Sequence, residues 1–240
     1  MTDRNTPRRV LRLLVATLKG GSSKTTTAIM LAVAAAQSGL RVVLICADTT
    51  NRGAARWTRK AISNGYEVPY IFLEWDPDSK GPLSKFAKQA EKDNEADAVL
   101  IDTGGEKAEF FTWGCLYADW LISPVSPVEG ELEGIGPTYA AASAVSDGGS
   151  DLYQSVLLTR SPKPGEGQAK RARRELEEDR RNDDGNYDPN QSWSVAAHVF
   201  ETEISRNLSY SDMHGIVPPD LGDYQGVWGE IKKYRQEMGI

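Results

Sequence analysis

The loop between residues 19 and 26 constrains the fold of this 240-residue chain more than any other stretch. It reads Lys-Gly-Gly-Ser-Ser-Lys-Thr-Thr and lies between an apolar run, Val10 to Thr17, and an Ala- and Leu-rich segment, Lys24 to Ser38. The run is typical of a buried strand, and the segment predicts a helix that stops at Gly39. Small residues before a helix let backbone N–H groups approach an anion. The sequence therefore predicts a strand, a phosphate-binding loop and a helix.

Strand and helix patterns then alternate along most of the chain. Apolar runs predict further strands at 41–47, 70–75, 98–101, 120–123, 155–159 and 196–200. Ala-rich or amphipathic segments predict further helices at 54–63, 83–92, 110–116, 131–145 and 224–238. This alternation favours an α/β fold, a mostly parallel twisted sheet flanked by helices on both faces. We expect a single domain over residues 1–240, with a flexible loop at 182–194.

Composition limits the class of protein. The formal net charge of −6 argues against attraction of the whole protein to nucleic acid, so DNA contact would need a local basic patch. No run of 18 apolar residues is present, so we expect no membrane-spanning segment. We also expect no membrane partner, because the apolar face of the basic tail at 231–235 is expected to pack on the domain. The two cysteines, Cys46 and Cys115, lack metal-ligand spacing and fit the reducing cytoplasm.

The chemistry of the loop suits a nucleoside triphosphate. Lys24 is expected to reach the β- and γ-phosphates of ATP, and the Thr25 hydroxyl is expected to ligate Mg²⁺. The nucleotide-binding loop comprises Lys19, Gly20, Gly21, Ser22, Ser23, Lys24, Thr25 and Thr26. The strict P-loop pattern has glycine where this chain has Leu18 and Ser23. If position 23 needs a positive φ, serine costs roughly 1 kcal/mol relative to glycine.

With its second lysine, Lys19, the loop resembles the deviant Walker A motif of the ParA/MinD family of ATPases. The resemblance implies a P-loop NTPase fold and a homodimer that forms on ATP binding. In that family the first lysine reaches across a nucleotide sandwich dimer, which gives this role to Lys19. A cation supplied by a second subunit stabilises charge on the transferring γ-phosphoryl group, as an arginine finger does.

Two carboxylates follow predicted strands. Asp102 ends the strand 98–101 in the Walker B arrangement, which places it near the Mg²⁺ shell. Asp48 follows the strand 41–47, where the resemblance implies a residue that orients the attacking water. A helix cap is the alternative role for Asp48. The family has another aspartate at the position of Cys46, which we interpret as a packed residue and not a nucleophile.

Other segments extend the resemblance to the ParA branch. Residues 51–57, Asn-Arg-Gly-Ala-Ala-Arg-Trp, and 102–106, Asp-Thr-Gly-Gly-Glu, look like ParA homologues tied to plasmid partition or T-DNA transfer. Residues 120–127 resemble a strand and loop that face the dimer interface. Thr159 and Arg160 stand where the family contacts adenine. Ordinary strand ends are the alternative for the last two features.

Two basic groups are candidates for DNA contact. Relatives of the ParA type bind DNA nonspecifically as ATP-bound dimers, through basic residues in their C-terminal portions. The candidates are Lys170, Arg171, Arg173, Arg174, Arg206, Lys232, Lys233 and Arg235. A solvated helix with i,i+4 ion pairs is the alternative for the first group. Only 18 residues precede Lys19, so we expect sequence-specific reading to need a ParB-like or relaxosome-type partner, with the protein cytoplasmic and nucleoid-associated.

The leading hypothesis is therefore a slow ATPase, stimulated by DNA and a partner, that supports plasmid or DNA partition or transfer. Ser23 and Cys46 motivate a second hypothesis, a pseudo-ATPase that holds ATP and DNA with little hydrolysis. The third is a metabolic P-loop enzyme. Two isolated cysteines disfavour an iron–sulfur reductase, and a ligase would have no need for Lys19.

Overall fold

The computed structural model describes residues 9–19, 23–104, 107–146, 152–162, 165, 167–178, 195, 197–206 and 213–238. A single seven-stranded sheet, with every strand pair parallel, runs through these residues. Its strand order is β3-β2-β4-β1-β5-β6-β7. The strands are β1 (Leu11–Val15), β2 (Val42–Ala47), β3 (Ile71–Glu74), β4 (Ala98–Thr103), β5 (Trp120–Val125), β6 (Tyr153–Leu158) and β7 (His198–Val199).

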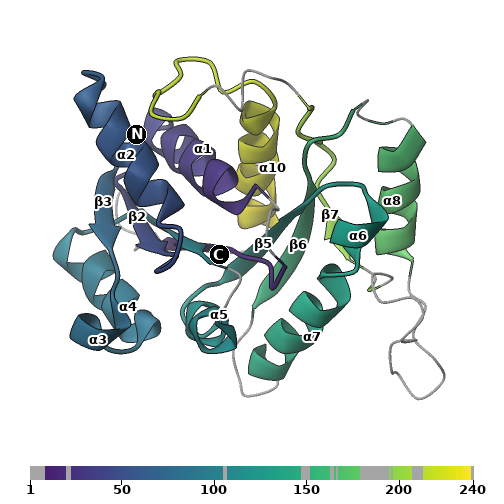
Figure 1. Ribbon diagram of the computed structural model, residues 1–240, viewed down its shortest axis with the longest axis horizontal. Helices are drawn as coiled ribbons and strands as arrows, with labels where there is room; N and C mark the ends of the chain where they lie inside the picture. The colour runs from purple at the N-terminus through teal and green to yellow at the C-terminus, as the bar shows by residue number, and fades with distance from the viewer. Residues whose placement is uncertain are drawn as a thin grey trace.

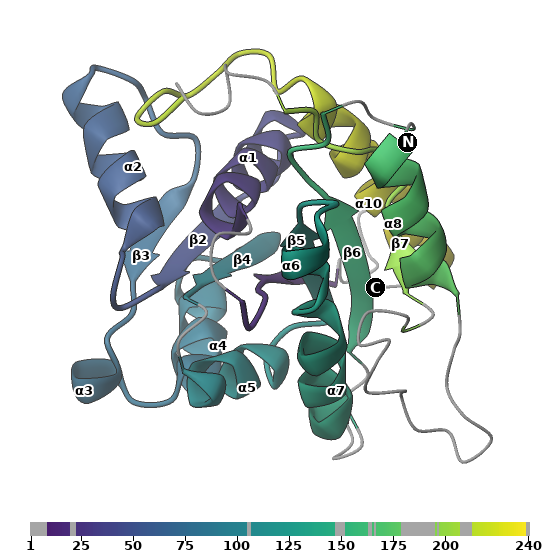
Figure 2. The same ribbon diagram turned by 45° about the vertical axis from the view of Figure 1, so that its right-hand side comes forward.

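Helices cover both faces of the sheet (Figures 1 and 2). One face packs against α1 (Lys24–Gln37), α2 (Gly53–Ser63) and α10 (Asp223–Met238). The other packs against α4 (Leu83–Asp93), α5 (Ala108–Cys115) and α7 (Ile135–Ser146). The remaining helices are α3 (Pro77–Lys80), α6 (Glu129–Leu132) and α8 (Gly167–Glu177), of which α8 lies beside β7.

Continuous apolar runs form the central strands because both faces of this sheet are covered. Every residue of β2, β4 and β5 is buried, which explains why these strands lack the alternating pattern of a half-exposed sheet. The edge strand β3 is more open: Ile71 is exposed, and its other three residues are half-buried. Nine consecutive residues of α1, Thr27 to Ala35, are buried, so this helix lies deep in one layer.

The C-terminal helix is fastened to the helix that begins at the phosphate loop. The hydroxyls of Thr27 in α1 and Tyr224 in α10 share a buried hydrogen bond of 3.1 Å. Trp228 Nε1 donates to Ser38 Oγ at 2.7 Å, at the other end of α1. Val227 and Ile231 add fully buried apolar contacts. The chain's last described helix is thereby part of the main core.

The predicted α/β fold is confirmed, and most predicted elements match observed ones within two or three residues. The single helix expected at 131–145 is wrong, because the chain forms α6 and α7 with a turn at Glu133 and Gly134 between them. Helix α3 was not predicted, although Asp76 caps it by accepting from the Asp78 N–H at 3.1 Å. The loop expected at 182–194 lies outside the described residues.

None of the helices in the described part of the chain is both long enough and apolar enough to cross a bilayer.

Candidate nucleotide-binding site

The candidate site lies where β1, β2 and β4 end. Parallel strands have their carboxyl ends at one edge of the sheet, where the following loops gather. Val15 of β1 pairs in register with Asp102 of β4, which in turn pairs with Cys46 of β2. The loops that leave these strands therefore bring the start of α1, Asp48 and Asp102 to one place.

Ser23 stands in a strained conformation directly before α1. Its φ of 61° and ψ of 18° are left-handed, and its side chain makes no capping hydrogen bond. Its carbonyl accepts the Thr27 N–H at 2.9 Å, which closes the first helical turn. The positive φ is the condition under which serine costs roughly 1 kcal/mol relative to glycine. Residues 20–22 of the loop lie outside the described part of the chain.

Lys24 folds back over the loop, where its Nζ donates to the carbonyl of Lys19 at 3.2 Å. Burial lowers the pKa of Lys24, and the carboxylates of Asp102, Asp48 and Glu131 oppose that shift. Burial makes the charged amine costly, so an anion bound beside it would be favoured. The position suits a lysine that meets phosphate oxygens.

Asp102 is fully buried, and Thr25 is its hydrogen-bonding neighbour. Thr25 Oγ1 donates to Asp102 Oδ2 at 3.0 Å. Asp102 Oδ1 is also buried and accepts no hydrogen bond within the described residues. Burial raises the pKa of Asp102 to about 7, with a smaller contribution from Asp48 in the same direction. An unused carboxylate oxygen beside a threonine hydroxyl is an oxygen donor set that Mg²⁺ prefers, so these residues fit that ion.

Asp48 organises the turn that leads into α2. Its Oδ1 accepts the N–H groups of Thr50 at 3.1 Å and Asn51 at 2.8 Å, whereas Arg52 occupies the N-cap position of the helix. Cys46 is 3% exposed, and burial raises the pKa of its thiol to about 12. A thiol with that pKa is a poor nucleophile at neutral pH, in line with the packed role expected from the sequence.

Two glycines allow the close approach of these groups, a role that the sequence analysis did not give them. A Cβ at Gly53 would fall 2.8 Å from Thr25 Oγ1, and one at Gly104 would fall 2.9 Å from Asp48 Oδ1. Both positions lie within the segments 51–57 and 102–106 that carry the resemblance, which is the sequence signal for their role. Any larger residue would displace Thr25 or Asp48.

Lys19 points toward the turn between α6 and α7 of its own chain. Its Nζ donates to the carbonyl of Gly130 and lies 3.4 Å from Glu133 Oε2. A Cβ at Gly134 would fall 2.8 Å from Lys19 Cβ, so this glycine makes room for the lysine. The Lys19 side chain is 45% exposed, so it can leave Gly130 and Glu133 and contact another partner.

The ends of β5 and β6 carry buried polar groups without partners among the described residues. Arg160 has a φ of 54°, and its Nη2 donates to both oxygens of Glu131 at 2.6 Å. Glu131, which sequence reasoning missed, also accepts the Ser126 N–H at 3.1 Å. Hydroxyls that are buried and make no hydrogen bond within the described residues include those of Ser123, Thr159 and Ser161. Such groups suit a ligand with its own donors and acceptors, for example a purine base.

The basic candidates divide into exposed side chains and structural ones. On α8, Arg173 points inward, where its Nη2 donates to the carbonyl of Phe200 at 2.7 Å and lies 3.3 Å from Glu203 Oε1. On α10, Arg235 donates to the carbonyl of Arg9. The other candidates are exposed: Lys170, Arg171, Arg174, Arg206, Lys232 and Lys233. Arg171 lies 3.7 Å from Glu175, so the expected i,i+4 pairing is present there.

Comparison with known proteins places the chain in a family. The sequence profile described as "CobQ/CobB/MinD/ParA nucleotide binding domain" matches residues 13–232. The protein ParA of Rhizobium radiobacter is 28% identical over 115 residues, 48% of this chain and 48% of that protein. The match thus spans about half the length of that relative.

Solved structures share the fold over nearly the whole chain. Apo McdA from Cyanothece superposes with a TM-score of 0.70 at 18% identity, over 94% of this chain and 99% of that one. A putative plasmid partition protein from Borrelia burgdorferi B31 bound to AMPPNP superposes with a TM-score of 0.65 at 14% identity, over 94% and 100% of the two chains. At these identities the likeness concerns the fold, which is the ParA/MinD arrangement of a P-loop NTPase.

Proposed function

Because this chain belongs to the CobQ/CobB/MinD/ParA nucleotide-binding domain family, we propose that it is an ATPase whose ATP-bound form is a homodimer that supports plasmid or DNA partition or transfer. The observation that carries the proposal is the hydrogen bond between Thr25, at the start of α1, and the buried Asp102, beside Lys24. These groups supply the hydroxyl, carboxylate and ammonium that a Mg²⁺–triphosphate requires.

The residues around the loop divide the work of hydrolysis. Lys24 leaves the carbonyl of Lys19 and binds the β- and γ-phosphate oxygens of ATP. The backbone N–H groups at the start of α1 bind the triphosphate. Thr25 and Asp102 hold Mg²⁺, which when bound neutralises charge on the phosphates. Asp48, fixed by its turn, orients the attacking water. Thr159 and Arg160 contact the adenine.

Lys19 links hydrolysis to assembly. In the single chain the Lys19 ammonium contacts the Gly130 carbonyl and Glu133. In the proposed dimer it leaves these contacts and binds the γ-phosphate of the ATP in the second subunit. The exposed position of its side chain and the single charged contact at 3.4 Å keep this exchange inexpensive. ATP binding and dimerisation are then coupled, because each subunit completes the site of the other.

We assign DNA contact to the exposed members of the two basic groups. Lys170, Arg171 and Arg174 on α8, with Lys232 and Lys233 on α10, are accessible to phosphates, whereas Arg173 and Arg235 bond to the protein backbone. A dimer doubles the number of phosphate contacts, so affinity for DNA should fall steeply with salt. A ParB-like or relaxosome-type protein would supply sequence-specific binding and stimulate turnover in the cytoplasm, at the nucleoid.

Sedimentation velocity tests the switch directly. Wild type, Lys19→Ala and the control Lys92→Ala, which changes an exposed lysine in the last turn of α4, are compared with ATP, ADP and no nucleotide. We expect a dimer with ATP alone, its loss in Lys19→Ala and its retention in Lys92→Ala. The proposal would be contradicted if wild type stayed monomeric with ATP, or if Lys19→Ala formed the dimer as well as wild type does.

The positive φ of Ser23 favours a second candidate, a pseudo-ATPase that holds ATP and DNA with little turnover. Strain at this position displaces the first N–H groups of α1, which a transition state needs in place. Phosphate release by Ser23→Gly and by wild type separates the two candidates. A gain of tenfold or more from glycine supports the pseudo-ATPase, and equal rates that DNA stimulates support the ATPase switch.

A further inference from the structure

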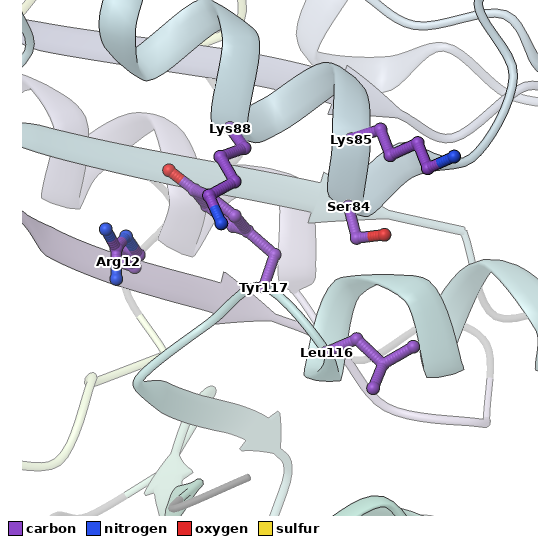
Figure 3. A pocket seen from close by; sticks show the side chains of 6 residues that line it. All are labelled: Arg12, Ser84, Lys85, Lys88, Leu116 and Tyr117. Carbon is purple, nitrogen blue, oxygen red and sulfur yellow. The ribbon is translucent and has the colours of Figure 1, made fainter.

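A second pocket lies at the opposite end of β1 from the candidate nucleotide site. Its volume is about 320 Å³, and it is lined by Arg12, Ser84, Lys85, Lys88, Leu116 and Tyr117. Figure 3 shows Ser84, Lys85 and Lys88 on one helix, α4, with Leu116 and Tyr117 on the segment after α5 and Arg12 on β1. Arg12 pairs in register with Val99, three residues before Asp102 along β4, so the two sites are separate.

The charged side chains that line this pocket are all positive. Arg12 uses Nε and Nη2 on the two oxygens of Glu91, at 2.7 and 2.9 Å. Its Nη1 makes no hydrogen bond within the described residues, and Asp119 Oδ1 lies 3.8 Å away. Lys85 and Lys88 are exposed and form no ion pair with any described carboxylate. Donors on three cations therefore remain available to an anion.

The floor of the pocket is held in place by a network of short bonds. Tyr117 donates its hydroxyl to Glu91 Oε2 at 2.6 Å, and the Arg12 guanidinium lies 5.5 Å from the centre of the Tyr117 ring. Glu91 thus fixes both the cation and the ring before any ligand arrives, which lowers the entropic cost of binding. Leu116, which is 54% exposed, adds an apolar edge to the opening.

We propose that this pocket binds a small organic anion. Figure 3 shows Lys88 reaching over Tyr117 toward Arg12, whereas Ser84 and Lys85 lie on the far side of that ring. Lys88 and Arg12 Nη1 therefore hold a carboxylate or phosphate group, and the Tyr117 ring with Leu116 covers an apolar or planar body. The volume is at the lower end of small-molecule sites, which fits a ligand of about ten heavy atoms. A DNA duplex is too broad for such a pocket, so this site is distinct from the basic groups on α8 and α10.

Phenyl phosphate is a suitable probe because it carries both features. Binding is measured by isothermal titration calorimetry and by saturation-transfer NMR in wild type and in Lys85→Ala/Lys88→Ala. The matched control is Lys60→Ala/Lys92→Ala, which removes the same charge from exposed positions outside the pocket and outside the two basic groups. We expect the double pocket variant to bind at least tenfold more weakly and the control to stay within twofold of wild type.

Further arms identify the chemistry and the location. Phenol should bind at least tenfold more weakly than phenyl phosphate, and inorganic phosphate should also bind more weakly. Because the phosphate loop also binds phosphate groups, the titration is repeated in Lys24→Ala, where the pocket component should persist. Three outcomes would overturn the proposal. Lys24→Ala could lose all binding of phenyl phosphate, or the Lys85→Ala/Lys88→Ala variant could bind it as tightly as wild type. Wild type could also fail to bind phenyl phosphate at a ligand concentration of about 10 mM.

Discussion

Charged side chains lie at both ends of strand β1, partly buried at the amino end and fully buried at the carboxyl end, under opposite conditions. At the amino end, Arg12 forms a two-point ion pair with Glu91, Tyr117 donates to the same carboxylate, and the pKa of Glu91 is lowered, chiefly by the Arg12 hydrogen bonds. At the carboxyl end, burial raises the pKa of Asp102 to about 7, and one of its oxygens has no hydrogen-bond partner among the described residues.

The contrast separates charges that hold the fold from charges kept for a ligand. A carboxylate with several donors stabilises the native state, whereas one short of donors costs free energy until something binds it. Lys24 follows the same pattern as Asp102, since burial opposes its charged form and lowers its pKa. The predictions below test this contrast, beginning with the largest expected effect.

Removal of the cation at the carboxyl end should have the largest consequence. We expect Lys24→Ala to lower the rate of ATP hydrolysis about 10³-fold, roughly 4 kcal/mol of transition-state stabilisation, while the fold is kept. Phosphate release measured beside the control Lys92→Ala checks this. A fall of less than tenfold would mean that Lys24 does not meet the transferring phosphoryl group.

Asp102→Asn should stabilise the protein without nucleotide. Between about pH 4, near the ordinary value of 3.8, and about pH 7, folded Asp102 keeps a proton that the unfolded chain has released. Stability therefore falls as pH rises through this window, by up to about 4 kcal/mol. In urea unfolding, the free energy of unfolding of Asp102→Asn should exceed that of wild type by up to this amount at pH 8. The two free energies should be equal at pH 4. Parallel curves for the two proteins would refute the raised pKa.

At the amino end the same kind of change should destabilise. Glu91→Ala leaves Arg12 and Tyr117 without their shared acceptor, and we expect a loss of roughly 2 kcal/mol in the free energy of unfolding, tempered by partial exposure of the pair. Glu67→Ala, an exposed glutamate, is the control and should change stability by less than about 0.5 kcal/mol. Equal losses of unfolding free energy in Glu91→Ala and Glu67→Ala would show that the bonds among Arg12, Glu91 and Tyr117 do not stabilise the fold.

The smallest effect concerns the backbone of the phosphate loop. Ser23→Gly should raise the free energy of unfolding by up to about 1 kcal/mol, because glycine adopts a φ of 61° without a Cβ penalty. Ser23→Ala, which keeps the Cβ, should give no gain. Thermal unfolding of the three proteins in the absence of nucleotide decides between them, and equal gains from both variants would point to the hydroxyl instead of the backbone.

Much of the fold could be predicted because the strands are buried on both faces. Runs such as Val42 to Ala47 are apolar without interruption, and a short run of this kind, rich in β-branched residues, is typical of a strand in a covered parallel sheet. The order of the strands could not be obtained this way, since nothing local in β1 specifies that β4 and β5 become its neighbours. The break between α6 and α7 was missed because Glu133 and Gly134 are a weak stop signal within a helical pattern.

The candidate site could be predicted where a motif names the residue, and less well where packing decides. Lys24, Thr25, Asp48 and Asp102 lie together as their places after strands and in the loop suggested. The contacts of Arg173 were not foreseeable, because its partners are backbone carbonyls 26 and 27 residues away in sequence. The hydrogen bond from Lys19 to the Gly130 carbonyl likewise depends on how the phosphate loop packs against α6, which is distant in sequence.

The bond between Thr27 and Tyr224 limits how this protein can be divided. A chain cut before residue 223 would uncover the apolar side of α1, three residues from Lys24, and expose surface that now lies beneath Val227 and Ile231. Truncation therefore cannot isolate nucleotide binding from the basic C-terminal helix. Point substitutions at Lys232 and Lys233 are the way to study those two properties apart.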